Sequence, residues 1–137
     1  MCGSGSNGKG SFMRFLIRFV GINNIISSNI TKLQKGTFET AKLYQKLVCV
    51  ISETNYDVLE QTDILKSLSG GDLIGAEFKG KNGFNFFNKA KIFILTNGLP
   101  DTLDKTDAFF RRVQIEDFLN KFQEGKPPED EIPESEF

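Results

Sequence analysis

A glycine-rich segment near the beginning of the chain has the spacing of a phosphate-binding loop. It reads Gly3-Ser4-Gly5-Ser6-Asn7-Gly8-Lys9-Gly10-Ser11. Glycines at 3, 5 and 8 allow backbone conformations that side chains forbid, so successive N–H groups can converge on a phosphate while Lys9 reaches the β and γ oxygens. We therefore predict a nucleoside triphosphate site formed by Gly3, Gly5, Ser6, Asn7, Gly8, Lys9, Gly10 and Ser11.

The segment directly after the loop has the pattern of a helix. Phe12, Phe15, Leu16 and Phe19 recur at helical spacing, Arg14 and Arg18 fall on the opposite face, and Gly21 is placed to end the helix. The positive end of the helix dipole would favour an anion at the loop. A flexible Gly/Ser linker has the same composition, but it gives no reason for Asn-Gly-Lys directly before an amphipathic run.

The residue after the lysine departs from the usual loop. A Ser or Thr normally stands there and its hydroxyl ligates Mg²⁺, whereas this chain has Gly10 followed by Ser11. We expect Ser11 to take the metal role, directly or through a water molecule.

Two apolar runs end in polar residues that suit the same chemistry. Residues 47–51 and 92–95 are continuously apolar and rich in β-branched types, which predicts strands of a parallel sheet. The first run leads to Glu53 and the second to Asn97. Because the carboxyl ends of parallel strands share one edge, we expect both side chains to lie beside the glycine loop.

Hydrolysis of a γ-phosphate needs neutralised charge, an oriented water molecule and a sensor of the terminal phosphate. Lys9 would neutralise the phosphate, Glu53 would polarise the water, and Asn97 would bond the water or the γ-phosphate. Arg111 and Arg112 would add positive charge. Each of these residues also has an ordinary structural interpretation. Glu53 alone is typical of a solvated loop acid, Asn97-Gly98 of a turn, and Arg111-Arg112 of a surface pair or a carboxylate partner.

The remaining segments give a layered α/β arrangement with an inserted hairpin. Helices are expected over 37–45, with Thr37 as N-cap, and over 57–68, before the break at Gly70-Gly71, while 22–28 has no clean period. Strands 73–78 and 84–87 would flank a turn at Asn82-Gly83, and 113–115 would be a further short strand. Lys79 and Lys81 fall at the hairpin tip, where a solvated surface is the alternative to a binding role.

Composition limits the broad class of the protein. The 137 residues suit one domain, 39% are hydrophobic, and no run is long enough to span a bilayer. No secretory signal is visible, so we expect a cytoplasmic protein, in the host cytoplasm if the source is a phage or virus. Cys2 and Cys49 form no disulfide framework, and the absence of histidine argues against a structural metal.

Charge is distributed unevenly along the chain. Residues 124–137 contain six acids and one lysine, which leaves 16 basic and 12 acidic residues in the rest. That excess permits contact with a polyanion without predicting one. We expect two parts, a folded core over 1–122 and an acidic, proline-containing, disordered extension over 123–137.

Taken together, the motifs resemble the superfamily 3 helicase domain of phage, plasmid and viral primase-helicases. The resemblance covers roughly residues 2–122 and rests on Asn-Gly-Lys in the loop, on Lys66-Ser-Leu-Ser-Gly-Gly-Asp72 and on Thr96-Asn-Gly-Leu-Pro100. It implies an AAA+ type P-loop ATPase that uses ATP and Mg²⁺, assembles as a hexameric ring and moves single-stranded DNA through its pore. It also implies that Lys79 and Lys81 touch DNA and that Arg111 or Arg112 completes a neighbouring subunit's site.

Two features depart from the family pattern. Ser52-Glu53 stands where many AAA+ proteins have Asp-Glu, so metal ligation would rest on Ser11, Ser52 or water. Only Met1-Cys2 precede Gly3, whereas a phosphate loop normally comes after a central strand. We therefore expect a fragment of a longer protein that lacks this strand and any attached primase, with weak activity in isolation.

The leading hypothesis is an ATP-dependent DNA helicase motor. The alternatives are an AAA+ ATPase that acts on protein or as a switch, and a non-catalytic nucleotide-binding or assembly module.

Overall fold

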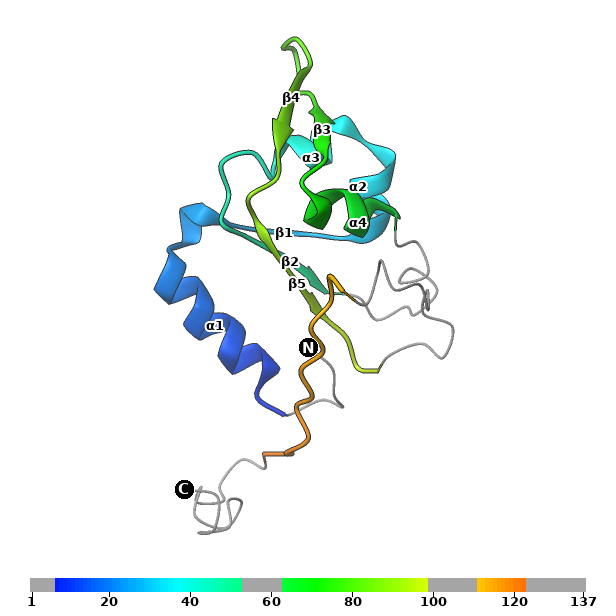
Figure 1. Ribbon diagram of the computed structural model, residues 1–137. Coiled ribbons are helices and arrows are strands. Elements are labelled where there is room, and N and C mark those ends of the chain that lie inside the picture. The colour runs from blue at the N-terminus through cyan, green and yellow to red at the C-terminus, as the bar shows by residue number, and fades with distance from the viewer. Residues whose placement is uncertain (1–6, 53–62, 99–110, 123–137) are drawn as a thin grey trace.

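The central element of the structure is a parallel sheet of three strands. The computed structural model describes residues 7–52, 63–98 and 111–122. Within them, β1 (Ile25–Ser28), β2 (Val48–Ser52) and β5 (Lys91–Leu95) pair in the order β1-β2-β5 (Figure 1). Both pairings are parallel, with Val50 opposite Ser27 on one side and Phe93 on the other. The expected parallel α/β sheet flanked by helices is confirmed, and it is compatible with a P-loop-like fold.

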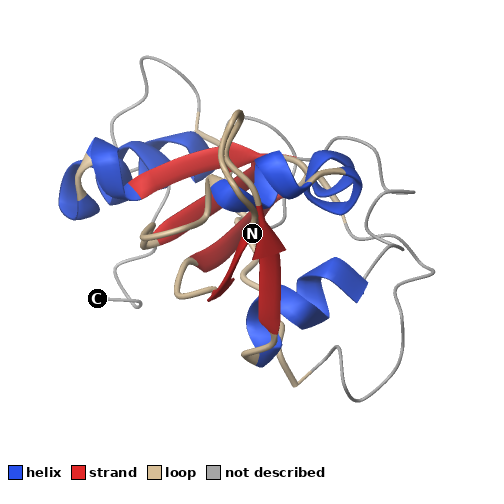
Figure 2. Cartoon of the chain, turned by 90° about the horizontal axis from the view of Figure 1, so that it is seen from above, coloured by secondary structure: helices blue, strands red, loops and turns tan. Residues whose placement is uncertain are grey.

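Strand β2 is buried on both faces, which explains its continuous apolar sequence. Val48 and Val50 belong to one hydrophobic cluster, and Cys49 and Ile51 belong to another. Successive strand residues point to opposite faces of a sheet, so each cluster fills one face. Figure 2 accordingly shows helices on both sides of the strands.

Helix α1 (Lys9–Val20) covers the first face of the sheet. Met13 is buried against Val48 and Val50, and Phe12, Leu16 and Val20 are packed around them. Phe12 and Leu16 of the predicted stripe therefore face the sheet, and Met13 and Val20 complete the inward stripe.

The expected core positions of Phe15 and Phe19 are wrong. Both side chains are exposed and their rings stack on each other with centroids 6.1 Å apart. Gly21 ends the helix as predicted, with a φ of +86° and an N–H that donates to the Ile17 carbonyl at 3.0 Å.

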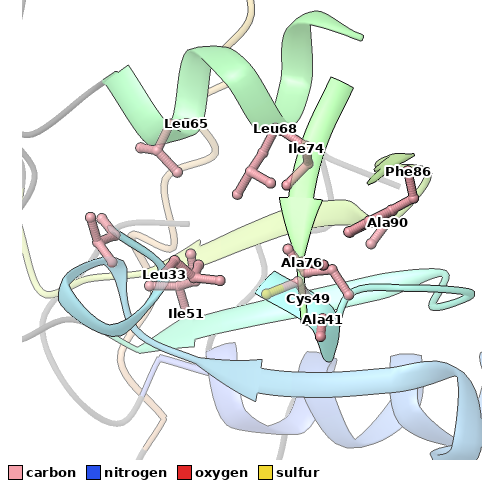
Figure 3. Close-up of a cluster of buried hydrophobic side chains, with 12 residues drawn as sticks. Leu33, Ala41, Cys49, Ile51, Leu65, Leu68, Ile74, Ala76, Phe86 and Ala90 are labelled. Carbon is pink, nitrogen blue, oxygen red and sulfur yellow. The ribbon is translucent and has the colours of Figure 1, made fainter. Parts of the chain in front are cut away.

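The second face is covered by three helices and a hairpin. These are α2 (Ile30–Lys35), α3 (Thr37–Ala41), α4 (Asp63–Gly70) and the antiparallel pair β3 (Leu73–Ala76) and β4 (Phe84–Phe87). Leu65 and Leu68 of α4 point toward the side chains of β2 (Figure 3). The expected inserted hairpin is thus present and contributes Ile74, Ala76 and Phe86 to the core.

Several short elements differ from the predictions. Residues 22–28 form the 3₁₀ helix η1 (Ile22–Asn24) and β1, and α2 was not predicted. Helix α3 is shorter than expected and its N-cap is Gly36, because Thr37 is already its first residue. Residues 113–115 form no strand. The part of the expected helix over 57–62 lies outside the described residues.

The hairpin turn also lies earlier than predicted. The N–H of Lys81 donates to the Phe78 carbonyl at 2.9 Å, and Gly80 has a φ of +75°. A glycine with positive φ at the third position of a turn defines its geometry, so the turn is centred on Lys79-Gly80 and not on Asn82-Gly83.

No helix within the described ranges is both long and apolar enough to cross a membrane.

Candidate phosphate-binding site

Lys9 reaches from the first residue of α1 to the carboxyl end of β5. Its side chain is only 9% exposed. The ammonium Nζ donates to the Thr96 carbonyl oxygen at 3.3 Å and to the Asn97 Oδ1 at 3.4 Å. Two of the predicted site residues, separated by 88 positions in the sequence, therefore meet at one edge of the sheet.

The end of β2 lies beside the end of β5. Ser52, the last residue of β2, is paired with Leu95, the last residue of β5. Thr96 and Asn97 come directly after Leu95 in the chain. Glu53 is next to Ser52 in the chain, but it lies outside the described residues, as do Gly3, Gly5 and Ser6.

The beginning of α1 suits an anion. Gly8 is the N-cap, in the left-handed region with a φ of +88°, and no side chain caps the helix. The first turn contains no acidic residue, so the partial positive charge of the helix end is not offset there. A buried ammonium beside this helix end matches the donor set that a phosphate requires, so the residues present fit the phosphates of a nucleotide.

Gly10 and Ser11 lie on the first turn of the same helix. Both are exposed, and a Cβ placed on Gly10 would meet nothing within 4 Å. The Ser11 hydroxyl accepts a hydrogen bond from Arg14 Nη2 at 3.0 Å. The metal role of Ser11 stays a prediction.

A segment near the far end of the described chain lies against the loop. Asn7, which is 4% exposed, donates from Nδ2 to the Phe118 carbonyl oxygen at 2.9 Å. The rings of Phe12 and Phe118 meet edge to face at 6.3 Å. A Cβ on Gly8 would lie 3.3 Å from Cε2 of Phe122. We did not predict this contact from the sequence. The one local signal for it was the spacing of Phe118 and Phe122, which lie four positions apart.

Arg112 lies near the end of α4. A Cβ on Gly70, the last residue of that helix, would be 3.7 Å from Arg112 Nη2. Arg111 and Arg112 are both exposed. A role in a neighbouring subunit's site stays a prediction for both residues.

The hairpin lysines lie at the end of the molecule away from the start of α1 (Figure 1). Lys79 and Lys81 are exposed at the turn, and Phe78 stacks on Phe84 beneath it with ring centroids 5.2 Å apart. Strand β3 is attached to α3, because the Thr40 hydroxyl donates to the Gly75 carbonyl at 2.9 Å. The hairpin therefore carries two exposed lysines at its tip.

Two side chains on the second-face side of the sheet, Cys49 and Glu39, have shifted pKa values. Burial raises the pKa of the Cys49 thiol to about 12, with a smaller contribution from the charge of Glu39. Partial burial raises the pKa of Glu39, but hydrogen bonds from Lys42 and Ser28 and nearby positive charge outweigh it, so the pKa is lowered from 4.5. Cys49 is thus a protonated core residue and not a nucleophile.

Comparison with known proteins connects the chain to one family and to a viral protein named as a helicase. The family model described as "Family of unknown function (DUF5906)" matches residues 1–112. A protein named "Putative helicase L207/L206" from Acanthamoeba polyphaga mimivirus is 27% identical over 128 residues, which cover 89% of this chain and 13% of that protein. The chain therefore spans about an eighth of this relative.

A solved structure supports the fold. The A form apo structure of the NrS-1 C-terminal region aligns with 93% of this chain and 30% of that chain, with a TM-score of 0.62 and 19% sequence identity. At that identity the likeness concerns the fold alone.

Proposed function

We propose that this chain, which belongs to the DUF5906 family, forms the ATPase core of a superfamily 3 type helicase motor that acts on single-stranded DNA during replication. The observation that carries the proposal is the contact of Lys9 with Thr96 and Asn97 beside the uncapped start of α1. The relative named as a helicase supports the same class.

Lys9 would bind the β and γ oxygens of the nucleotide. Its hydrogen bonds to Thr96 and Asn97, at 3.3 and 3.4 Å, are longer than the usual N–H···O distance, so exchanging these contacts for phosphate oxygens gives up little. The exchange would also free Asn97 Oδ1 to accept a hydrogen bond from the attacking water, while Asn97 Nδ2 could donate to the γ-phosphate. When bound, MgATP supplies the activated γ-phosphoryl group that is transferred to water.

The other roles belong to the same site. Glu53 would orient and polarise the attacking water, and Arg111 or Arg112 would stabilise the transition state in the neighbouring subunit of a hexameric ring. Ser11 would take part in holding Mg²⁺. An attached primase belongs to this proposal as well.

The hairpin would grip the DNA backbone. Lys79 and Lys81 are exposed at its tip, and contacts between lysines and phosphates release counterions, so such binding weakens steeply with salt.

The first experiment measures nucleotide binding and hydrolysis. Replacing Lys9 by Ala removes a charge-assisted contact, which corresponds to a loss of about 10- to 100-fold in affinity for MgATP. Lys91→Ala is the matched control, because Lys91 is exposed at the opposite end of β5. Equal affinities of the two variants would refute the nucleotide site.

The second experiment separates DNA from protein as the substrate. In Lys79→Glu/Lys81→Glu, affinity for an oligothymidylate should fall and lose its salt dependence. The control Lys35→Glu/Lys91→Glu makes the same charge change at exposed positions elsewhere. If both double variants bind equally, an AAA+ ATPase that acts on protein or as a switch replaces the helicase proposal.

A non-catalytic nucleotide-binding module is the second candidate function. It is favoured by Gly10 and Ser52, which stand where related ATPases have metal ligands. Turnover that is abolished in Glu53→Gln, with MgATP binding retained, would exclude this candidate.

A further inference from the structure

Residues 111–122 contact the end of α4 and the start of α1, and we call them the linking segment. At its beginning, the Arg112 guanidinium lies over Gly70 and Val113 packs against the second-face core. At its end, Phe118 accepts the hydrogen bond from Asn7 and Phe122 lies against Gly8. Figure 1 shows the segment running from the region of α4 toward the start of α1.

The first anchor lies at the root of the hairpin. Gly70 ends α4 and is separated from β3 by only Gly71 and Asp72. Val113 is partly buried and packs against the cluster that contains Leu68 of α4 and Ile74 of β3. A shift of Val113 therefore acts on the helix and the strand from which the hairpin projects.

The second anchor lies on the glycine loop. Asn7 and Gly8 directly precede Lys9, and the buried Asn7 amide is held by the Phe118 carbonyl. The Phe118 ring packs on Phe12 in the first turn of α1. A movement of the loop on nucleotide binding therefore acts on Phe118.

The stretch between the anchors is short and exposed, and Asp117 takes part in an isolated β-bridge beside the second anchor. Residues 114–117 are exposed, whereas Val113 and Phe118 are partly buried. Five residues span at most about 17 Å when fully extended, so the two anchors cannot move far apart. The segment is held at its ends and can transmit displacement between them.

We propose that the linking segment couples the glycine loop to the root of the β3–β4 hairpin, with Phe118 and Val113 as positioning residues. The expected consequence is that nucleotide binding alters the affinity of the hairpin for DNA, and this consequence rests on the proposed function. The coupling itself is a property of the ligand-free protein.

Hydrogen exchange of the ligand-free chain tests the coupling directly. In Phe118→Ala, we expect the exchange of amides 70–76 at the hairpin root to quicken about fivefold or more, because their distant anchor is lost. Leu119→Ala is the matched control, since Leu119 is 85% exposed in the same segment, and its exchange should stay within about twofold of the wild type. Conversely, Val113→Ala should quicken exchange of the Phe12 amide, which donates to the Gly8 carbonyl in the first turn of α1.

A purely local effect would overturn the proposal. If hydrogen exchange in Phe118→Ala becomes faster only at amides 7–12 and is unchanged at amides 70–76, the loop and the hairpin root are not coupled. If Phe118→Ala does not fold, Phe118→Leu and Val113→Ala provide the same comparison, because each keeps an apolar side chain at its anchor.

A binding experiment then tests the consequence. The ratio of oligothymidylate affinities with and without a magnesium complex of a non-hydrolysable ATP analogue measures the coupling, which is typically about fivefold or more. Phe118→Ala should reduce this ratio to below about twofold while each ligand still binds.

The outcomes separate the two proposals. A wild-type ratio that is retained in Phe118→Ala overturns the linking role and leaves the helicase proposal intact. Failure of the wild type to bind either ligand overturns the proposed function, and hydrogen exchange still decides the linking role.

Discussion

Two glycines on either side of Lys9 should respond in opposite directions to the same substitution. Gly8 has a φ of +88°, and a Cβ there would also lie 3.3 Å from Cε2 of Phe122. The left-handed conformation costs an ordinary residue about 1–2 kcal/mol. Gly10 lies within α1, and a Cβ there would meet nothing within 4 Å. Alanine at a helical position stabilises by about 0.5–1 kcal/mol relative to glycine.

Gly8→Ala should therefore lower the free energy of unfolding by about 1–2 kcal/mol, and Gly10→Ala should raise it by about 0.5–1 kcal/mol. Urea unfolding monitored by far-ultraviolet circular dichroism measures both values under the same conditions.

Gly21→Ala separates backbone strain from the contact with Phe122. Gly21 also has a positive φ, of +86°, and its Cβ would meet Asn24 Nδ2 at 3.5 Å, an ordinary contact distance. If Gly21→Ala lowers the free energy of unfolding as much as Gly8→Ala does, the effect of Gly8→Ala comes from the backbone conformation. If Gly21→Ala lowers it less, part of the effect comes from the contact with Phe122. If Gly8→Ala and Gly10→Ala change stability in the same direction, the left-handed Gly8 and the helical Gly10 inferred for this loop are wrong.

Three further outcomes concern the core. Ile51→Ala should lower the free energy of unfolding by about 2–5 kcal/mol, because Ile51 is fully buried, whereas Leu47→Ala, at a half-exposed position, should cost well under that in the same urea titration. In a Cys2→Ser background, Cys49 should react with a thiol reagent at pH 8 only after unfolding. The reason is that a pKa of about 12 leaves roughly one thiol in ten thousand ionised at that pH. Rapid reaction of the folded protein would contradict the burial of Cys49. Glu39→Gln should be less stable than the wild type above about pH 5, and the difference in unfolding free energy should shrink as the pH falls below 4.5, because the folded carboxylate has the lowered pKa; a constant difference across that range would contradict the hydrogen bonds to this carboxylate.

The sheet could be predicted well because its strands carry a strong local pattern. Residues 47–51 and 92–95 are continuously apolar, which is a property of strands covered on both faces, and the structure has β2 and β5 there. Parallel strands that end together place the residues after them at one edge. The meeting of Lys9 with Asn97 could therefore be expected from the motif order alone.

Short elements and the inward face of α1 could not be predicted in the same way. Strand β1 has four residues and α2 has six, too few for a hydrophobic period to stand out. In α1, the sequence offers two apolar stripes, one through Phe15 and Phe19 and one through Met13 and Val20. The stripe that is buried depends on how the helix meets Val48 and Val50, which is a matter of packing between distant segments.

The chain's own sequence determined where a phosphate-loop motif stands, which runs become strands, and that the hairpin carries lysines, because each of these depends on neighbours within a few positions. Only the tertiary structure decided that Asn7 is held by Phe118, 111 positions away, that Arg112 lies beside the end of α4, and that Val113 packs against the second-face core. Those contacts depend on the path of the whole backbone, and no local pattern of residues records that path.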